Sequence, residues 1–188
     1  MEVMAEEGVA ALSLSEVARR MGLRPPSLYQ YFPSRMAIYD ALFERGMRHV
    51  LEVVEPYRAR LADDPITAIT DAQDAMFAWV LANPVLAQLL YWRPVPGFEP
   101  SARAFEPALR QVEFAREALR AAVDAGQLAP AAASEDGVAL YTVLISGVIS
   151  QQLSNEPAAR PGQGRFMRLT PTALDMFFRY YAPKEDGS

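Results

Sequence analysis

The stretch Leu23–Arg35, LRPPSLYQYFPSR, decides how the fold of this chain is interpreted. It places two consecutive prolines before a serine and three aromatic residues within four positions. Consecutive prolines are tolerated in the first turn of a helix, where backbone N–H groups have no intrahelical partner. The stretch therefore predicts a short helix from Pro25 to Phe32, whose aromatic side chains must either be buried or contact a partner.

A second short helix is predicted just before this stretch. Ser13 lies three residues before Glu16, which is the spacing of a capping box. The helix then covers Leu14–Met21, and Met21 lies on its apolar face. Two short helices joined by residues 22–24, Gly-Leu-Arg, have the spacing of a helix-turn-helix. We expect Leu23 to fill the core between them.

The second helix of such a motif enters the major groove of DNA. Leu28 and Phe32 are four residues apart and should face the core, which leaves the opposite face for contacts with DNA. Tyrosine hydroxyls there can reach phosphates, and Gln30 can pair with adenine. Arg35 opens the next helix and can hold a phosphate. The predicted DNA-contacting residues are Ser13, Ser15, Arg24, Pro26, Ser27, Tyr29, Gln30, Tyr31 and Arg35.

The charge distribution favours a localised contact with nucleic acid. The net charge of the 188-residue chain is −5, which argues against indiscriminate coating of DNA. The segment Val9–Arg35, however, holds four arginines and one acidic residue. It is therefore expected to form a small basic patch on an acidic body.

The residue inventory argues against an enzyme. The chain has no cysteine, one histidine (His49, in a helical segment) and one lysine (Lys184, close to the end). A P-loop, a two-histidine zinc site and a Ser-His-Asp relay therefore lack their residues or depend on His49. The acidic pair Asp63 and Asp64 is expected to cap a helix, so a carboxylate enzyme is a weak alternative. We expect no metal or cofactor, no membrane partner and a cytoplasmic location.

Helix signals continue through the rest of the chain, and no stretch alternates with the period of a strand. Caps and N1 prolines mark the helix starts at Ser34, Asp64-Pro65, Asn83-Pro84, Ser101 and Ser134. The sequence therefore predicts an all-α fold: a three-helix helix-turn-helix domain over residues 1–48, and a helical ligand-binding and dimerisation domain over residues 49–188.

Large apolar side chains are dense between Pro65 and Leu128. Most should form a core, but a ligand pocket with the loop Arg93–Pro100 as its mouth is an alternative. Because few charges occur there, a small hydrophobic ligand is expected, with Gln73 among the polar anchors. The predicted ligand-binding residues are Met76, Trp79, Val80, Gln88, Tyr91, Trp92, Phe98, Phe105, Leu109 and Arg110.

The segment Val138–Leu153 carries no charge over sixteen residues. A helix that is apolar on all sides is buried on all sides. In a chain of this size, one side should meet the chain's own core and the other a second copy, which gives a four-helix interface together with the last helix. The predicted dimer-interface residues are Leu140, Val143, Leu144, Gly147, Val148, Gln151, Leu174, Phe177, Phe178 and Tyr181.

The segment from Gly8 to Phe43, GVAALSLSEVARRMGLRPPSLYQYFPSRMAIYDALF, resembles the DNA-binding domain of the tetracycline-repressor (TetR) family. The resemblance implies a homodimeric repressor that leaves a palindromic operator when a small molecule binds. It also places Ser27, Tyr29, Gln30, Tyr31 and Arg35 on DNA-contacting positions. The family usually has lysine where Arg35 stands, and a longer first helix than residues 1–7 provide. The alternative is a helical bundle that binds a ligand or a protein without DNA.

Overall fold

The computed structural model describes residues 1–160 and 162–183, and within them the chain is helical and contains no β-strand. This confirms the all-α prediction. Lys184 lies outside the described residues. The α-helices are α1 (Glu2–Glu7), α2 (Leu14–Arg20), α3 (Pro25–Tyr31), α4 (Arg35–Val54), α5 (Pro65–Ala82), α6 (Pro84–Trp92), α7 (Ala102–Asp124), α8 (Glu135–Asn155) and α9 (Thr170–Tyr180). Short 3-10 helices cover Val9–Ala11, Glu55–Arg60, Pro130–Ala133 and Met167–Leu169.

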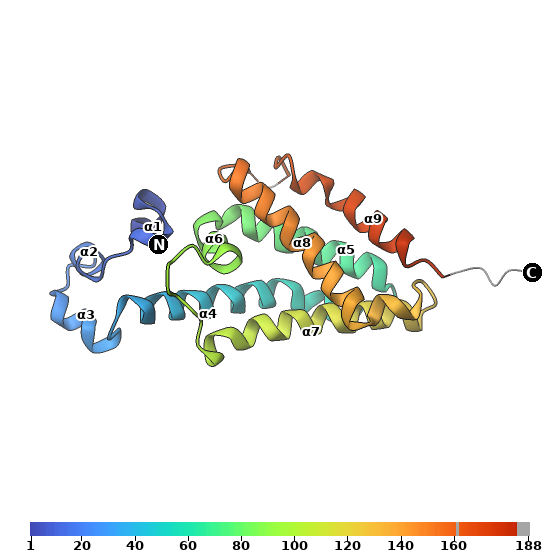
Figure 1. The fold of residues 1–188 in the computed structure, drawn as a ribbon, viewed down its shortest axis with the longest axis horizontal. Coiled ribbons are helices and arrows are strands. Elements are labelled where there is room, and N and C mark those ends of the chain that lie inside the picture. Colours follow the sequence, from blue (N-terminus) through green and yellow to red (C-terminus); the bar gives the residue numbers. More distant parts are fainter. Residues whose placement is uncertain (161, 184–188) are drawn as a thin grey trace, which may run out of the picture.

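The molecule is elongated, and its two ends differ (Figure 1). The short helices α1, α2 and α3 form one end, and the long helix α4 runs from them into the rest of the molecule. Helices α5, α6 and α7 pack against α4, while α8 and α9 form the outer layer on the far half. Helix α4 is therefore the element that joins the two ends.

Four predicted helix starts are confirmed by side-chain caps. The side chains of Ser34, Asp64, Ser101 and Ser134 each accept a hydrogen bond from the backbone N–H three residues later. Such a cap satisfies one of the donors that a helix leaves unpaired in its first turn. The helix boundaries within the larger part of the chain therefore follow from local sequence.

The capping box predicted at the start of α2 is absent. Ser13 makes no side-chain cap, and the Glu16 carboxylate instead accepts hydrogen bonds from Arg19 and Arg20 at 2.6 to 2.8 Å. A charge-assisted bond to a guanidinium is stronger than a neutral bond to a backbone amide, so the arginines take the carboxylate.

Leu23 and Met21 were predicted to face the core between the two short helices, but both face the solvent. Leu23 is 39% exposed and Met21 is 62% exposed. Gly22 makes the turn with φ +66°, and the Leu23 N–H donates to the carbonyl of Ala18 at 2.9 Å. Ala18 and Leu28 are buried between α2 and α3, so the space that Leu23 was expected to fill is occupied.

The uncharged segment of α8 has an inner and an outer side. Tyr141, Ile145 and Ile149 are buried, whereas Val143 and Gly147 are exposed. By length and composition alone α8 could cross a membrane, as could the bent pair α5 and α6 together, but core helices of water-soluble proteins meet the same criteria. The two-sided burial agrees with the expectation of one side on the chain's own core.

Candidate nucleic-acid interface and ligand cavity

Helix α3 presents a mixed aromatic and polar face at the end of the molecule. Leu28 is buried, Phe32 is half-buried and packs on the core, and Tyr29 and Tyr31 are 48% and 78% exposed. Gln30 is exposed beside them. The predicted orientation of this helix is therefore confirmed. Of the nine residues predicted to contact DNA, all are exposed except Ser27, which is half-buried.

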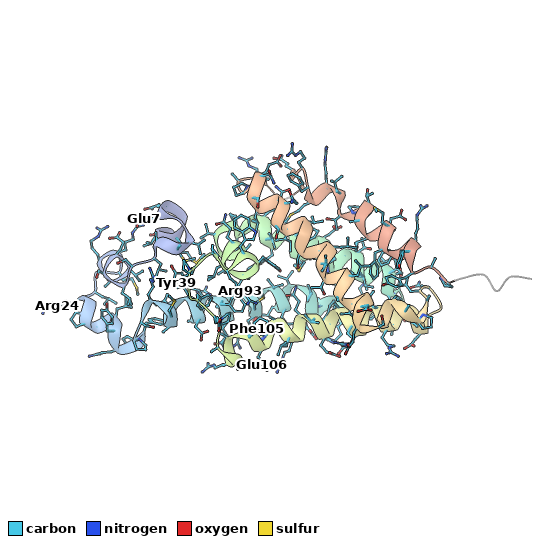
Figure 2. All side chains as sticks on the ribbon, viewed as in Figure 1. Glu7, Arg24, Tyr39, Arg93, Phe105 and Glu106 are labelled. Carbon is cyan, nitrogen blue, oxygen red and sulfur yellow. The ribbon has the colours of Figure 1, made fainter. Side chains whose placement is uncertain are left out.

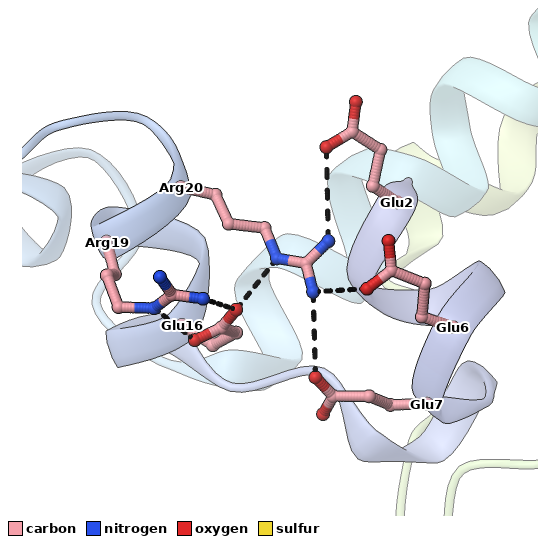
Figure 3. Close-up of polar contacts among 6 residues, drawn as sticks. All are labelled: Glu2, Glu6, Glu7, Glu16, Arg19 and Arg20. Carbon is pink, nitrogen blue, oxygen red and sulfur yellow. Dashed lines mark hydrogen bonds and ion pairs between the residues drawn. The ribbon is translucent and has the colours of Figure 1, made fainter.

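An ion-pair network centred on Arg20 holds α1 against α2 (Figure 3). The Arg20 guanidinium donates to Glu16 at 2.7 Å and to Glu6 at 2.6 Å. Hydrogen bonds from Arg19 and Arg20 lower the pKa of Glu16 to about 2. Two further carboxylates complete the ring around Arg20, namely Glu2 at 3.9 Å and Glu7 at 3.7 Å.

This network changes the expected electrostatics of the helix-turn-helix end. Residues 1–48 hold six acidic and six basic residues, so the positive charge predicted for Val9–Arg35 is balanced by neighbours. Arg19 and Arg20 are engaged with carboxylates, while Arg24 and Arg35 form no ion pair within the described residues. Figure 2 shows Arg24 at the outermost tip, beside α3. Arg45 on α4 is a third arginine of residues 1–48 without an ion pair in the described residues, so Arg24 and Arg35 are the two unpaired arginines that adjoin α3.

Two side chains of α4 support this end from behind. The Tyr39 hydroxyl is buried and donates to the backbone carbonyl of Val9 at 2.7 Å, which ties α4 to the segment between α1 and α2. The Asp40 carboxylate accepts from the backbone N–H and the hydroxyl of Ser101 at 2.7 and 2.8 Å. One turn of α4 therefore contacts both the helix-turn-helix and the start of α7.

The loop between α6 and α7 packs on the same stretch of α4. Phe98 is buried against Tyr39 and Phe43, with ring centroids 5.7 and 6.2 Å apart. Arg93 has the left-handed φ of 48°, and its guanidinium lies 5.7 Å from the Phe43 ring and 5.3 Å from the Phe105 ring. Figure 2 shows this cluster midway along the molecule. The loop was expected to form the mouth of a ligand pocket, but it seals the junction with α4 instead.

A cavity of about 80 Å³ lies between α4, α5, α6, α7 and α8. Of the ten predicted ligand-binding residues, Met76 and Tyr91 line it. Its full lining is Val54, Gln73, Met76, Tyr91, Gln111, Val112, Phe114, Ala115, Tyr141, Thr142, Ile145 and Ser146. In the part of the chain that the structure describes, no group of three His, Asp or Glu side chains is placed to hold a metal ion.

The other predicted ligand-binding residues lie elsewhere. Phe98 and Phe105 belong to the junction with α4. Leu109 is 59% exposed, and Arg110 is exposed and paired with Glu106 at 2.8 Å, because the buried side of α7 is formed mainly by small residues. The remaining four, which are buried or half-buried but outside this cavity, are Trp79, Val80, Gln88 and Trp92.

The polar lining of the cavity is uncharged. The Gln73 amide donates to the Tyr141 hydroxyl at 2.5 Å, and Gln111 donates to the Met76 sulfur at 3.1 Å. Burial raises the pKa of Tyr91 to about 12 and also raises that of Tyr141, so both hydroxyls keep their protons. Sequence reasoning missed Gln111 and Tyr141, because only the packing of α7 and α8 brings them to the cavity.

The residues predicted to form a dimer interface are partly exposed on α8 and mostly buried or half-buried on α9. Leu140, Val143 and Gly147 are exposed on one side of α8, as expected. Leu174 and Phe177, however, are each 2% exposed, and Phe177 packs on the Tyr141 ring at 5.7 Å, so both belong to the chain's own core. Three interface residues predicted on these helices are half-buried, namely Leu144, Val148 and Phe178; Tyr181, just past α9, is also half-buried, and Gln151 is exposed. The exposed large apolar residues at α9 are Leu169, Met176 and Tyr180.

An all-α chain with a terminal helix-turn-helix on a longer helical bundle defines a class of DNA-binding protein. The model of the bacterial regulatory proteins of the tetR family matches residues 1–42. This match identifies residues 1–42 as a tetR-type domain, as the sequence resemblance implied.

Two relatives illustrate the extent of the similarity. The HTH-type transcriptional regulator Rv1816 of Mycobacterium tuberculosis is 30% identical over 127 residues, which cover 65% of this chain and 53% of that protein. This chain therefore spans about half the length of that relative. The class A tetracycline repressor protein of transposon 1721 from Escherichia coli is 26% identical over 186 residues, which cover 94% of this chain and 76% of that protein.

Solved structures agree in fold along nearly the whole chain. The TetR family transcriptional regulator PfmR of Thermus thermophilus has a TM-score of 0.69 and 17% identity, covering 98% of this chain and 96% of its own. The transcriptional regulator FadR of Bacillus subtilis, solved in complex with stearoyl-CoA, has a TM-score of 0.68 and 18% identity, covering 94% and 92%. These structures support the arrangement of an N-terminal helix-turn-helix and a C-terminal helical domain.

Proposed function

We propose that this protein is a transcriptional regulator that binds double-stranded DNA through α3 and represses the genes it controls. The observation that carries the proposal is the exposed face of α3, where Tyr29, Gln30 and Tyr31 stand at the tip of the molecule. A recognition helix places such side chains on base edges and phosphates in the major groove. Arg24 and Arg35 flank this face and would hold the phosphates.

The DNA-binding unit is proposed to cover residues 1–48, and the ligand-binding and dimerisation unit residues 49–188. A second copy would pack on the exposed apolar side of α8 and α9, to which Val143 at 65% and Met176 at 66% exposure belong. An isologous dimer would present two copies of α3. To enter successive major grooves of a palindromic site, the two helices must lie about 34–36 Å apart.

A ligand in the central cavity is proposed to release the protein from its operator. Helix α4 begins beside α3, and Val54 at its other end lines the cavity. A ligand that binds better to a conformer with a different α4 position would shift the population away from the DNA-binding state. Asp40 and Phe98 connect α4 to the loop before α7, so that loop would move with it.

The test is fluorescence anisotropy with the intergenic DNA upstream of the protein's own gene, at two salt concentrations. Specific binding should exceed binding to random DNA and should weaken as salt rises, since neutralised phosphates release counterions. Replacing Tyr29 with Ala should weaken specific binding about tenfold or more without unfolding the protein. Leu109→Ala, an exposed apolar side chain on α7 outside the proposed DNA and dimer faces, is the control.

Equal affinity for specific and random DNA would contradict the proposal and favour a ligand- or protein-binding bundle. Normal specific binding by Tyr29→Ala would show that another face of the domain enters the groove. A shift of the monomer–dimer equilibrium in Tyr180→Ala, a separate variant at an exposed tyrosine of α9, would support the proposed α9 contact.

A further inference from the structure

The cavity between α4 and α8 contains hydrogen-bonding groups that the protein does not fully use. Gln73 is 7% exposed, and its Nε2 donates to the Tyr141 hydroxyl at 2.5 Å. Its Oε1 is the buried side-chain oxygen that has no partner among the described residues. Because a buried polar atom without a partner is costly, native structures rarely retain one without a reason.

The Tyr141 hydroxyl adds a donor to the same wall of the cavity. Since its oxygen accepts from Gln73, its hydrogen is available to another acceptor. Rotating the Gln73 amide by half a turn would exchange the roles, so that Tyr141 donates to Oε1 and Nε2 becomes the unpaired atom. In either arrangement the pair offers the cavity one donor and one acceptor.

Two further donors are directed at a poor acceptor. Gln111 Nε2 donates to the Met76 sulfur at 3.1 Å, and the Tyr91 hydroxyl approaches the same sulfur at 3.8 Å. A thioether sulfur is a weak acceptor, so an oxygen that enters the cavity would be a better partner for both groups. Met76 itself has an unbranched and adaptable side chain that can move aside.

We infer that this cavity selects an uncharged ligand whose head group both donates and accepts hydrogen bonds, such as a primary amide or an alcohol on an apolar body. The inference rests on the proposed function only in using the same cavity. The donor of the head group would satisfy Gln73, and its oxygen would accept from Tyr91, Gln111 or Tyr141.

A carboxylate is excluded by the same geometry. None of the described residues that line the cavity carries a charge, and a buried ion without a counter-charge is strongly disfavoured. A pure hydrocarbon would leave the Gln73 amide only half satisfied.

The size of the cavity sets the scale of the head group. At about 80 Å³ it is smaller than the roughly 150 Å³ cavity that holds benzene. The space therefore holds the head group and the first carbons of a linear amide or alcohol better than it holds an aromatic ring. The rest of a six-carbon chain would need the apolar side chains of the wall to move.

The experiment compares hexanamide, hexan-1-ol and hexanoate at equal millimolar concentration, at a pH where hexanoate is ionised. The readouts are the thermal unfolding midpoint and the methyl resonance of Met76 in protein labelled with carbon-13 at methionine methyls. We expect the amide and the alcohol to raise the midpoint and shift the Met76 resonance. Hexanoate should bind at least about tenfold more weakly, the factor expected for loss of one hydrogen bond of ordinary strength.

The variants Gln73→Leu and Tyr141→Phe should each reduce the preference for the amide over hexanoate. Gln88→Leu, on α6 and outside the cavity, is the matched control and should leave it unchanged. Equal binding of hexanoate, a preference that survives in both variants, or no shift of the Met76 resonance with any probe would each overturn the inference. DNA binding measured without probes is independent, so its failure would contradict the proposed function alone.

Discussion

The helix-turn-helix end and the helical bundle differ in the charge and burial of their polar side chains. At the helix-turn-helix end, charged groups lie near the surface, and those between α1 and α2 are paired, as in the ring of carboxylates around Arg20. In the bundle, the polar groups are neutral and buried, and the Gln73 amide is only half satisfied. From this difference we infer that the helix-turn-helix end keeps one conformation, whereas the bundle can adapt to a bound ligand.

Between the two ends lies an aromatic junction on α4. Phe43 is fully buried, stacks on Phe105 with centroids 6.1 Å apart and meets Phe98 edge-on. Tyr39, one turn earlier, makes the hydrogen bond to Val9. A change at the junction should therefore affect both ends, whereas a change within one end should remain local.

The largest effect is expected for Phe43→Ala. Removing a fully buried phenyl ring costs about 3–5 kcal/mol, because the lost contacts leave a cavity that relaxes only in part. The free energy of unfolding from urea titration measures it. Leu42→Ala, the half-buried neighbour on α4, should cost distinctly less. A cost below that of Leu42→Ala would show that the junction does not join the two ends.

Tyr39→Phe tests the helix-turn-helix end. The change keeps the ring but leaves the Val9 carbonyl without its donor, which should cost about 1–3 kcal/mol. Urea unfolding measures the loss, and hydrogen exchange of α1 and α2 amides should show that it is local. Tyr57→Phe, on a half-buried tyrosine outside this contact, is the control. Equal losses in both variants would contradict a specific role for the Val9 bond.

The double variant Gln73→Leu with Tyr141→Phe tests the helical bundle, where the buried polar groups are neutral. Replacing both partners of a buried hydrogen bond by apolar groups of similar shape can be nearly neutral or stabilising. We expect the free energy of unfolding to change by less than about 1 kcal/mol, unlike the loss in Tyr39→Phe. Urea titration under the same conditions provides the comparison. A large decrease in the free energy of unfolding would mean that this pair stabilises the fold and is not kept for ligand binding.

Local sequence predicted the helices and the orientation of α3, since caps, N1 prolines and the four-residue spacing of Leu28 and Phe32 are near-neighbour effects. It failed where several partners compete for one group. Glu16 was assigned to a capping box, but Arg19 and Arg20, three and four residues further on, bind it more strongly. The spacing permits both pairings, and the contact of Arg20 with Glu6 of α1 is not visible in it.

The register of α9 and the lining of the cavity also depend on long-range packing. Leu174 and Phe177 are as apolar as Met176 and Tyr180, so composition does not tell which pair faces inward. Gln111 is one of several polar residues on α7, and only the packing of α5 brings the Met76 sulfur within 3.1 Å of it.

The smallest effect is expected at the carboxylate that pairs with both arginines. Hydrogen bonds from Arg19 and Arg20 lower the pKa of Glu16 from its usual 4.5 to about 2, so the ionised group stabilises the folded state above pH 4.5. That contribution is lost as the pH falls from 4.5 to about 2. It should be modest, because these side chains are near the surface and salt screens them.

Glu16→Gln should therefore lower the thermal midpoint at neutral pH and leave it equal to that of the parent protein near pH 2. High salt at neutral pH should narrow the same gap. Glu52→Gln, an exposed carboxylate on α4 with no ion pair in the described residues, is the control. A difference in thermal midpoint that persists at this acidic pH would assign the effect of Glu16 to its shape and not to its charge, and the contact between α1 and α2 would then depend on packing alone.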